Sequence, residues 1–201
     1  MAKTHRERIP AAITGGILAA FTVFMAVPNI LPAPYALNFG AWGIFITWAG
    51  YFAAGGGGPG KTKEVYKKMY PAIAWGSFWG FVAGVLFTLY NPGFGQDYTA
   101  MLAFDFVVIF MVNQPILWGS KYWGPIKYTP ANFYGFATFF ATYFGSFGLS
   151  PGFGLQYVWI AWLSGLLMNF LGPIWAYLQV YLTFPKEVEV PDVPGEKRAT
   201  G

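Results

Sequence analysis

Two apolar stretches of ten residues decide the fold. Residues 43–52 read GIFITWAGYF, and residues 135–144 read GFATFFATYF. A shift of 92 positions places the first glycine of one stretch on the first glycine of the other, Ala49 on Ala141, and the final Tyr-Phe pair on its counterpart. The same shift places Gly56 on Gly148. A match at fixed spacing indicates an internal repeat. Neither stretch contains a charge, and each lies within a longer apolar run, so we expect both to form membrane helices.

The composition supports a membrane protein and excludes most soluble classes. Of the 201 residues, 56% are hydrophobic and 10% are charged, whereas soluble domains carry about 25% charged residues. The chain has no cysteine, and its one histidine is His5. Thiol catalysis, iron–sulfur clusters and a histidine-held haem are therefore excluded. We expect no enzymatic activity, no cofactor and no metal site.

Apolar runs predict six helices that span the membrane. A spanning helix needs about 20 predominantly apolar residues. The predicted spans are residues 9–27, 37–54, 71–89, 98–118, 130–149 and 154–182. The sequence therefore predicts an all-α membrane protein whose single transmembrane domain covers residues 1–184. The charged, proline-containing segment 185–201 is expected to be a disordered cytoplasmic tail.

The basic residues predict the orientation. Lysine and arginine fall into four groups, at positions 3–8, 61–68, 121–127 and 186–198. With six helices, all four groups lie on the same side of the membrane, and the loops of the other side carry only Asp97. The positive-inside rule then predicts that both termini lie in the cytoplasm. A cleaved signal peptide is the less favoured alternative, because it would leave five helices. Contact with the lipid bilayer is expected, and binding of nucleic acid is not.

The repeat divides the chain into two halves, residues 1–92 and 93–184. A second match joins residues 73–77 (IAWGS) to residues 160–164 (IAWLS), here at a shift of 87 positions. Three helices in each half place the halves in opposite orientations. This 3+3 inverted repeat is typical of transporters and channels, whose sites lie near the midplane between the halves.

The repeated segments resemble a known family. Residues 39–45 (FGAWGIF) lead to residues 49–56 (AGYFAAGG), and residues 129–139 read TPANFYGFATF. These motifs resemble a family of small bacterial inner-membrane proteins that is catalogued only as a domain of unknown function, and the likeness covers most of residues 10–180. A weaker resemblance joins residues 132–135 (NFYG), with Ala137 and Thr138, to the proton-gated channels for urea and short-chain amides. The second resemblance implies a six-helix channel.

Polar side chains inside the predicted spans are the candidate site. Asp105 is the one acidic residue well inside a span, and a charge there is costly unless it faces a partner or a wet cavity. Amide side chains offer donors and acceptors without charge. The predicted solute path consists of Asp105, Asn113, Gln114, Asn132, Asn169, Trp42 and Tyr134. The alternative for each amide is a hydrogen bond between helices.

Two glycine patterns have structural explanations. The string GGGGPGKT from Gly55 to Thr62 fits the P-loop pattern, but a P-loop follows a buried strand, and here an aromatic helix precedes it. No nucleotide binding is therefore expected. Gly76, Gly80 and Gly84 form a small-residue face for helix packing, either within the chain or between subunits of a homo-oligomer.

Three functions remain open at this point. The first is a channel or facilitator for a small neutral or weakly polar solute, with a path between the second, fifth and sixth helices. The second is a non-catalytic accessory subunit of a larger membrane complex. The third is a secondary transporter that uses Asp105 as its coupling site.

Overall fold

The computed structural model describes residues 2–5, 7–26, 41–90, 98–145, 154–184 and 187–190. The proline-rich stretch that begins at Pro28, the predicted loop residue Asp97 and most of the predicted tail lie outside these residues. The helices are α1 (Ala11–Ala26), α2 (Ala41–Tyr51), α3 (Thr62–Tyr90), α4 (Tyr98–Tyr122), α5 (Thr129–Phe144) and α6 (Leu155–Thr183). A π-helical turn, η1 (Phe52–Gly56), extends α2, and a 3-10 turn, η2 (Gly124–Ile126), joins α4 to α5.

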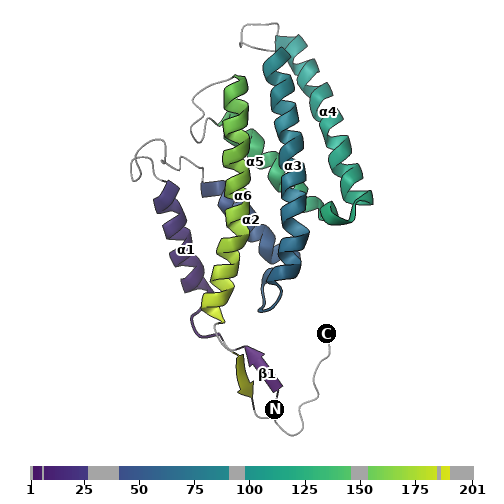
Figure 1. Ribbon diagram of the computed structural model, residues 1–201. Helices are drawn as coiled ribbons and strands as arrows, with labels where there is room; N and C mark the ends of the chain where they lie inside the picture. Colours follow the sequence, from purple (N-terminus) through teal and green to yellow (C-terminus); the bar gives the residue numbers. More distant parts are fainter. Residues whose placement is uncertain are drawn as a thin grey trace.

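Two long antiparallel helices, α3 and α6, form the centre of the molecule (Figure 1). Their register is visible in three contacts. The hydroxyl of Tyr66 donates to the carbonyl of Pro173, and the hydroxyl of Tyr70 donates to the carbonyl of Phe170. Further along α3, the rings of Phe81 and Trp159 lie 4.5 Å apart. The other helices pack around this pair: α5 and α4 against α3, and α2 and α1 against α6.

The prediction of six α-helices is confirmed among the described residues, but the prediction that all six span a membrane is wrong. Three described helices are long and apolar enough to cross a bilayer: α3, α6 and the part of α4 from Ala103 to Tyr122. The 16 residues of α1 and of α5 extend about 24 Å at 1.5 Å per residue, less than the hydrocarbon thickness of about 30 Å. The 11 residues of α2 extend less. At its described end, the α-helical geometry of α2 changes at Tyr51 to a π-helical turn, which hydropathy did not predict.

Helix α3 begins nine positions earlier than the predicted span. Its first two turns are amphipathic, and their apolar side, Val65 and Met69, is 2% and 0% exposed. Both side chains pack with Tyr51 in one buried cluster. These turns therefore belong to the packed helical bundle, with their apolar side against α2. Pro71 lies inside the continuous helix, where the missing N–H removes one hydrogen bond.

The three glycines of α3 all face α5 of the same chain. A Cβ atom at Gly76 would overlap the backbone of Asn132, and a Cβ atom at Gly80 or Gly84 would press on the ring of Phe139. Phe139 is fully buried. Small residues allow two helix backbones to approach closely. Because α5 occupies this face, the glycines serve packing within the chain, and the face is not available to a second copy.

Hydrogen bonds tie α1 to the end of α6. The hydroxyls of Thr14 and Thr183 lie 2.9 Å apart, and both side chains are buried. The amide of Gln179 donates to the carbonyl of Ala11, while its carbonyl oxygen accepts from the indole of Trp48. Gln179 therefore joins three helices, α1, α2 and α6.

The two ends of the described chain pair as short strands. β1 (Ala2–His5) runs antiparallel to β2 (Glu187–Val190), with Ala2 opposite Val190 and His5 opposite Glu187. The prediction of a disordered tail over residues 185–201 is wrong for these four residues. The alternation of glutamate and valine in β2 has the period of two that a strand requires. The pairing brings both ends to the same end of the molecule (Figure 1).

Candidate functional site

The most deeply buried polar group of α6 is Asn169, which is 0% exposed. Its Oδ1 atom accepts a hydrogen bond of 2.9 Å from the hydroxyl of Thr138 on α5. The hydroxyl of Thr142, one turn further along α5, donates to the backbone carbonyl of Thr138. The Nδ2 atom of Asn169 has no partner among the described residues. A buried donor without a partner costs about 1–3 kcal/mol, so this group is a candidate for function.

Glycines bring α2, α5 and α6 together around this amide. A Cβ atom at Gly43 of α2 would lie 3.2 Å from the Cβ atom of Met168 and 3.3 Å from the methyl of Thr138. A Cβ atom at Gly165 of α6 would lie 3.4 Å from the side chains of both Thr138 and Thr142. We name the five residues Asn169, Thr138, Thr142, Gly43 and Gly165 the polar centre. It lies where the sequence predicted a path between the second, fifth and sixth helices.

Asn132 was predicted to share this site but lies at the start of α5. Its Nδ2 atom donates to the carbonyl of Ile126 at 2.9 Å, which fixes the η2 turn to the helix. Its Oδ1 atom is buried and has no partner among the described residues. Six residues separate it from Thr138, about 9 Å along the helix axis. The structure therefore does not bring Asn132 together with Asn169.

The predicted site residues of α4 are also separate from the polar centre. Asn113 donates to the carbonyl of Ile109, and Gln114 donates to the carbonyl of Phe110, so both amide nitrogens bond within their own helix. The Oδ1 atom of Asn113 is buried and has no partner among the described residues. Asp105 is half-buried beside the exposed Phe106. Helix α4 packs against α3 and α5, whereas the polar centre lies between α5, α6 and α2.

The two predicted aromatic residues of the path take different positions. Trp42 directly precedes Gly43 on α2, and its indole nitrogen is buried without a partner among the described residues. Tyr134 packs against the cluster that contains Tyr51 and Met69, where a Cβ atom at Gly50 would overlap its ring. Trp42 therefore borders the polar centre, and Tyr134 fills the space between helices nearer the end of α2.

The sequence indicated Thr138 as a polar residue inside a span, but the predicted solute path included neither Thr138 nor Thr142. Their spacing of four residues places both hydroxyls on one face of α5. Threonine is common in membrane helices, where its hydroxyl bonds to the preceding turn. Gly135 is the signal that could have distinguished these two threonines from other threonines in membrane helices. It lies on the same segment of α5 and shows that this segment is packed closely.

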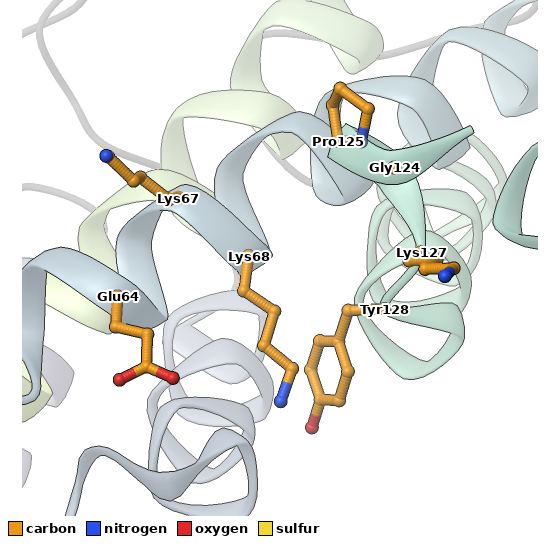
Figure 2. A pocket seen from close by; sticks show the side chains of 7 residues that line it. All are labelled: Glu64, Lys67, Lys68, Gly124, Pro125, Lys127 and Tyr128. Carbon is orange, nitrogen blue, oxygen red and sulfur yellow. The ribbon is translucent and has the colours of Figure 1, made fainter.

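A second polar region is a cavity at one end of α3, with a volume of about 360 Å³. Figure 2 shows the side chains that line it, from the first turns of α3 and from the connection between α4 and α5. They are Glu64, Lys67, Lys68, Gly124, Pro125, Lys127 and Tyr128. The structure thus joins two of the basic groups that the sequence placed on one side of the membrane.

The P-loop-like string does not have the surroundings of a P-loop. It begins in the π-helical turn after α2 and ends at Thr62, the first residue of α3. Gly55 and Gly60 have positive φ angles of 98° and 80°, so they turn the chain between the two helices. A helix, not a strand, precedes the string.

The fold and its buried polar centre define a helical membrane protein, with three helices long enough to cross a bilayer. The chain belongs to the family described as Protein of unknown function (DUF1097), whose model matches residues 12–184. The resemblance predicted from the aromatic and glycine motifs is thereby confirmed. No curated protein and no solved structure matches the chain, so the resemblance to urea and amide channels has no support from these comparisons.

Proposed function

We propose that the chain is a channel or facilitator for a small neutral or weakly polar solute in the bacterial inner membrane. The observation that carries the proposal is the unpartnered amide N–H of Asn169, which is fully buried where three helices meet. Its cost is offset if a passing solute accepts its hydrogen bond. The hydroxyls of Thr138 and Thr142 continue the polar surface along α5. The close packing of Gly43 on α2 against Met168 on α6 leaves no open passage beside Asn169, so the proposed path is closed in this arrangement.

The helix contacts support an inverted repeat. Exchanging α1 with α4, α2 with α5 and α3 with α6 converts most of the helix contacts into one another, the α5–α6 contact being the exception because α2 and α3 do not pack in the same way. The α2–α6 contact becomes α5–α3, the α1–α6 contact becomes α4–α3, and the α1–α2 contact becomes α4–α5. The central α3–α6 contact maps onto itself. This is the pattern expected of two three-helix halves related by a pseudo-twofold axis.

Individual residues support the same relation. The shift of 92 positions relates Gly80 to Gly172 and Thr47 to Phe139. Gly80 faces Phe139, and Gly172 faces Thr47. The contact between α3 and α5 therefore corresponds, residue by residue, to the contact between α6 and α2.

The arrangement of charges favours cytoplasmic termini. The start of α1 bonds to the end of α6 through Thr14 and Thr183, and the start of α3 packs on the second half of α6 through Tyr66. Lys68 lies against Tyr128 in the α4–α5 connection. Three basic groups are therefore at one end of the molecule, as the positive-inside rule requires of the cytoplasmic side.

Solute flux in proteoliposomes tests the proposal. Stopped-flow light scattering would compare urea, acetamide, glycerol, formate and acetate for the wild type and for Asn169→Leu. We expect selective flux in the wild type and a decrease of at least about tenfold in the variant, because removal of a buried hydrogen-bonding group costs about 1.5 kcal/mol or more. Thr138→Val, which keeps the shape of the side chain, should decrease flux in the same direction.

Asn113→Leu is the matched control, because it removes the same amide from α4, away from the polar centre. Its flux should stay within about twofold of the wild type. Equal losses in Asn113→Leu and Asn169→Leu would contradict the assigned path. A folded wild type that passes no solute above the rate of empty liposomes would exclude the channel and favour the accessory-subunit alternative.

The secondary-transporter alternative makes a different prediction. It requires accumulation of solute against a gradient and the loss of that accumulation in Asp105→Asn. Because α4 is separate from the polar centre, we expect Asp105→Asn to keep the flux of the wild type. Loss of flux in a folded Asp105→Asn protein would place the path along α4 instead.

A further inference from the structure

The cavity at the start of α3 has an excess of positive charge. Three lysines, Lys67, Lys68 and Lys127, line it together with a single acid, Glu64. No ion pair joins these lysines to another described residue, so their charges are not neutralised within that part of the chain. Neighbouring lysines without acidic partners attract anions, and the attraction increases near a low-dielectric surface.

The shape of the cavity depends on two segments that are distant in the sequence. Lys68 reaches from α3 toward Tyr128, and its ammonium nitrogen lies 4.6 Å from the centre of that ring (Figure 2). Lys67 points away from Tyr128 in the same view, and Lys127 lies on the neighbouring connection. The cation–π contact holds Lys68 in place without using its hydrogen-bond donors.

Tyr128 can act as a hydrogen-bond donor in this cavity. Burial, with a smaller contribution from the nearby Tyr134, raises the pKa of the Tyr128 hydroxyl above its usual value. The group therefore keeps its proton at neutral pH and above. A protonated hydroxyl beside an ammonium group offers two donors to one anionic oxygen.

The surroundings of the cavity are those of a membrane interface. It lies at the ends of two spanning helices, α3 and α4. The nearby end of α4 exposes large amphipathic aromatic side chains: Trp118 is 67% exposed, Tyr122 70% and Trp123 58%. Trp and Tyr concentrate at the headgroup level of bilayers. The ring of Trp123 lies 5.3 Å from that of Trp75, and Trp123 directly precedes Gly124, which lines the cavity.

We propose that this cavity binds the phosphate group of an anionic glycerophospholipid. Lys68 and Lys127 supply the positive charge, and the hydroxyl of Tyr128 donates to a phosphate oxygen. The acyl chains lie against the aromatic surface formed by Trp123 and Trp75. Bound lipid would thereby connect the first turns of α3 to the α4–α5 connection. The site is independent of the solute path, because the polar centre shares no residue with it.

Lipid binding to the detergent-solubilised full chain tests the site. Native mass spectrometry would measure the affinity for phosphatidylglycerol and for phosphatidylcholine with the same acyl chains. We expect one phosphatidylglycerol to bind at least about tenfold more tightly than phosphatidylcholine. Lys68→Gln/Lys127→Gln should weaken phosphatidylglycerol binding by about thirtyfold, given the usual contribution of about 1 kcal/mol for each lysine near an anionic lipid surface. Tyr128→Phe, which keeps the ring under Lys68, should weaken it by a smaller factor.

Lys61→Gln/Lys63→Gln is the control, because it removes the same charge from neighbouring exposed positions that do not line the cavity. Its affinity should change by less than about twofold. Equal losses in the two double variants would overturn the proposal, because they would indicate diffuse attraction to the whole basic end. Displacement of the lipid by equimolar inorganic phosphate would also overturn it and would identify free phosphate as the ligand.

Discussion

Gly76→Ala is expected to lower the free energy of unfolding by about 3 kcal/mol, the upper end of the usual cost of overpacking. The added methyl group would overlap the backbone carbonyl of Asn132 on α5. A backbone atom cannot rotate away as the end of a side chain can, so the two helices must separate. Their separation would also loosen Phe139, which is fully buried between them.

Thermal unfolding of the detergent-purified protein measures this effect, together with the monodisperse fraction after purification. Gly16→Ala is the control, because a Cβ atom at Gly16 meets nothing within 4 Å and the residue is exposed on α1. The control should unfold at the temperature of the wild type or slightly above, since alanine favours a helix over glycine. Equal stability of both variants would show that α3 and α5 are not packed as described.

Gly172→Ala is expected to have an effect of similar size at the α2–α6 contact. A Cβ atom there would overlap the hydroxyl of Thr47 and would lie 2.5 Å from the carbonyl oxygen of Ile44 and 2.7 Å from the amide nitrogen of Trp48. Two of these three neighbours are backbone atoms. We therefore expect a loss of about 2–3 kcal/mol, and Thr47→Ala should not restore stability in the double variant.

The control for this contact is Gly43→Ala, which lies on the same pair of helices. Its Cβ atom would lie 3.2 Å from the Cβ atom of Met168 and 3.3 Å from the methyl of Thr138, so a shift of a few tenths of an ångström relieves both contacts. The same unfolding measurement should show a change below about 1 kcal/mol. Full rescue of Gly172→Ala by Thr47→Ala would contradict the backbone contact and would assign the clash to the threonine side chain alone.

Helix α6 shows how much local sequence could predict. The predicted span of residues 154–182 agrees with Leu155–Thr183 to within one residue at each end. Gly154 precedes a long, predominantly apolar run, and no charge occurs within the helix. Helix α3 shows the limit of the same reasoning. Its basic first turns have the composition of a surface loop, but Val65 and Met69 are buried by contact with Tyr51. A hydropathy profile considers each segment alone and therefore does not detect a contact with a residue of another helix.

The candidate site shows a similar division. The sequence selected Asn169 because an amide in the middle of an apolar helix needs a partner, and the structure places it between α5, α6 and α2. The sequence also selected Asn113 and Gln114 for the same reason, and those two amides bond to their own helix. All three residues are amides within an apolar helix, so the sequence does not distinguish them. Only the direction of each side chain relative to the neighbouring helices does so.

The sequence by itself determined the class of protein, the number of helices, the family and the grouping of basic residues. These properties depend on composition, local periodicity and motif spacing, all of which a single chain displays. The tertiary structure alone decided that the α3 glycines face α5, that Thr138 pairs with Asn169, and that Lys68 meets Tyr128. Each of these contacts joins residues far apart in the chain. Their geometry follows from how closely two helix backbones approach, which is fixed by packing across the whole domain.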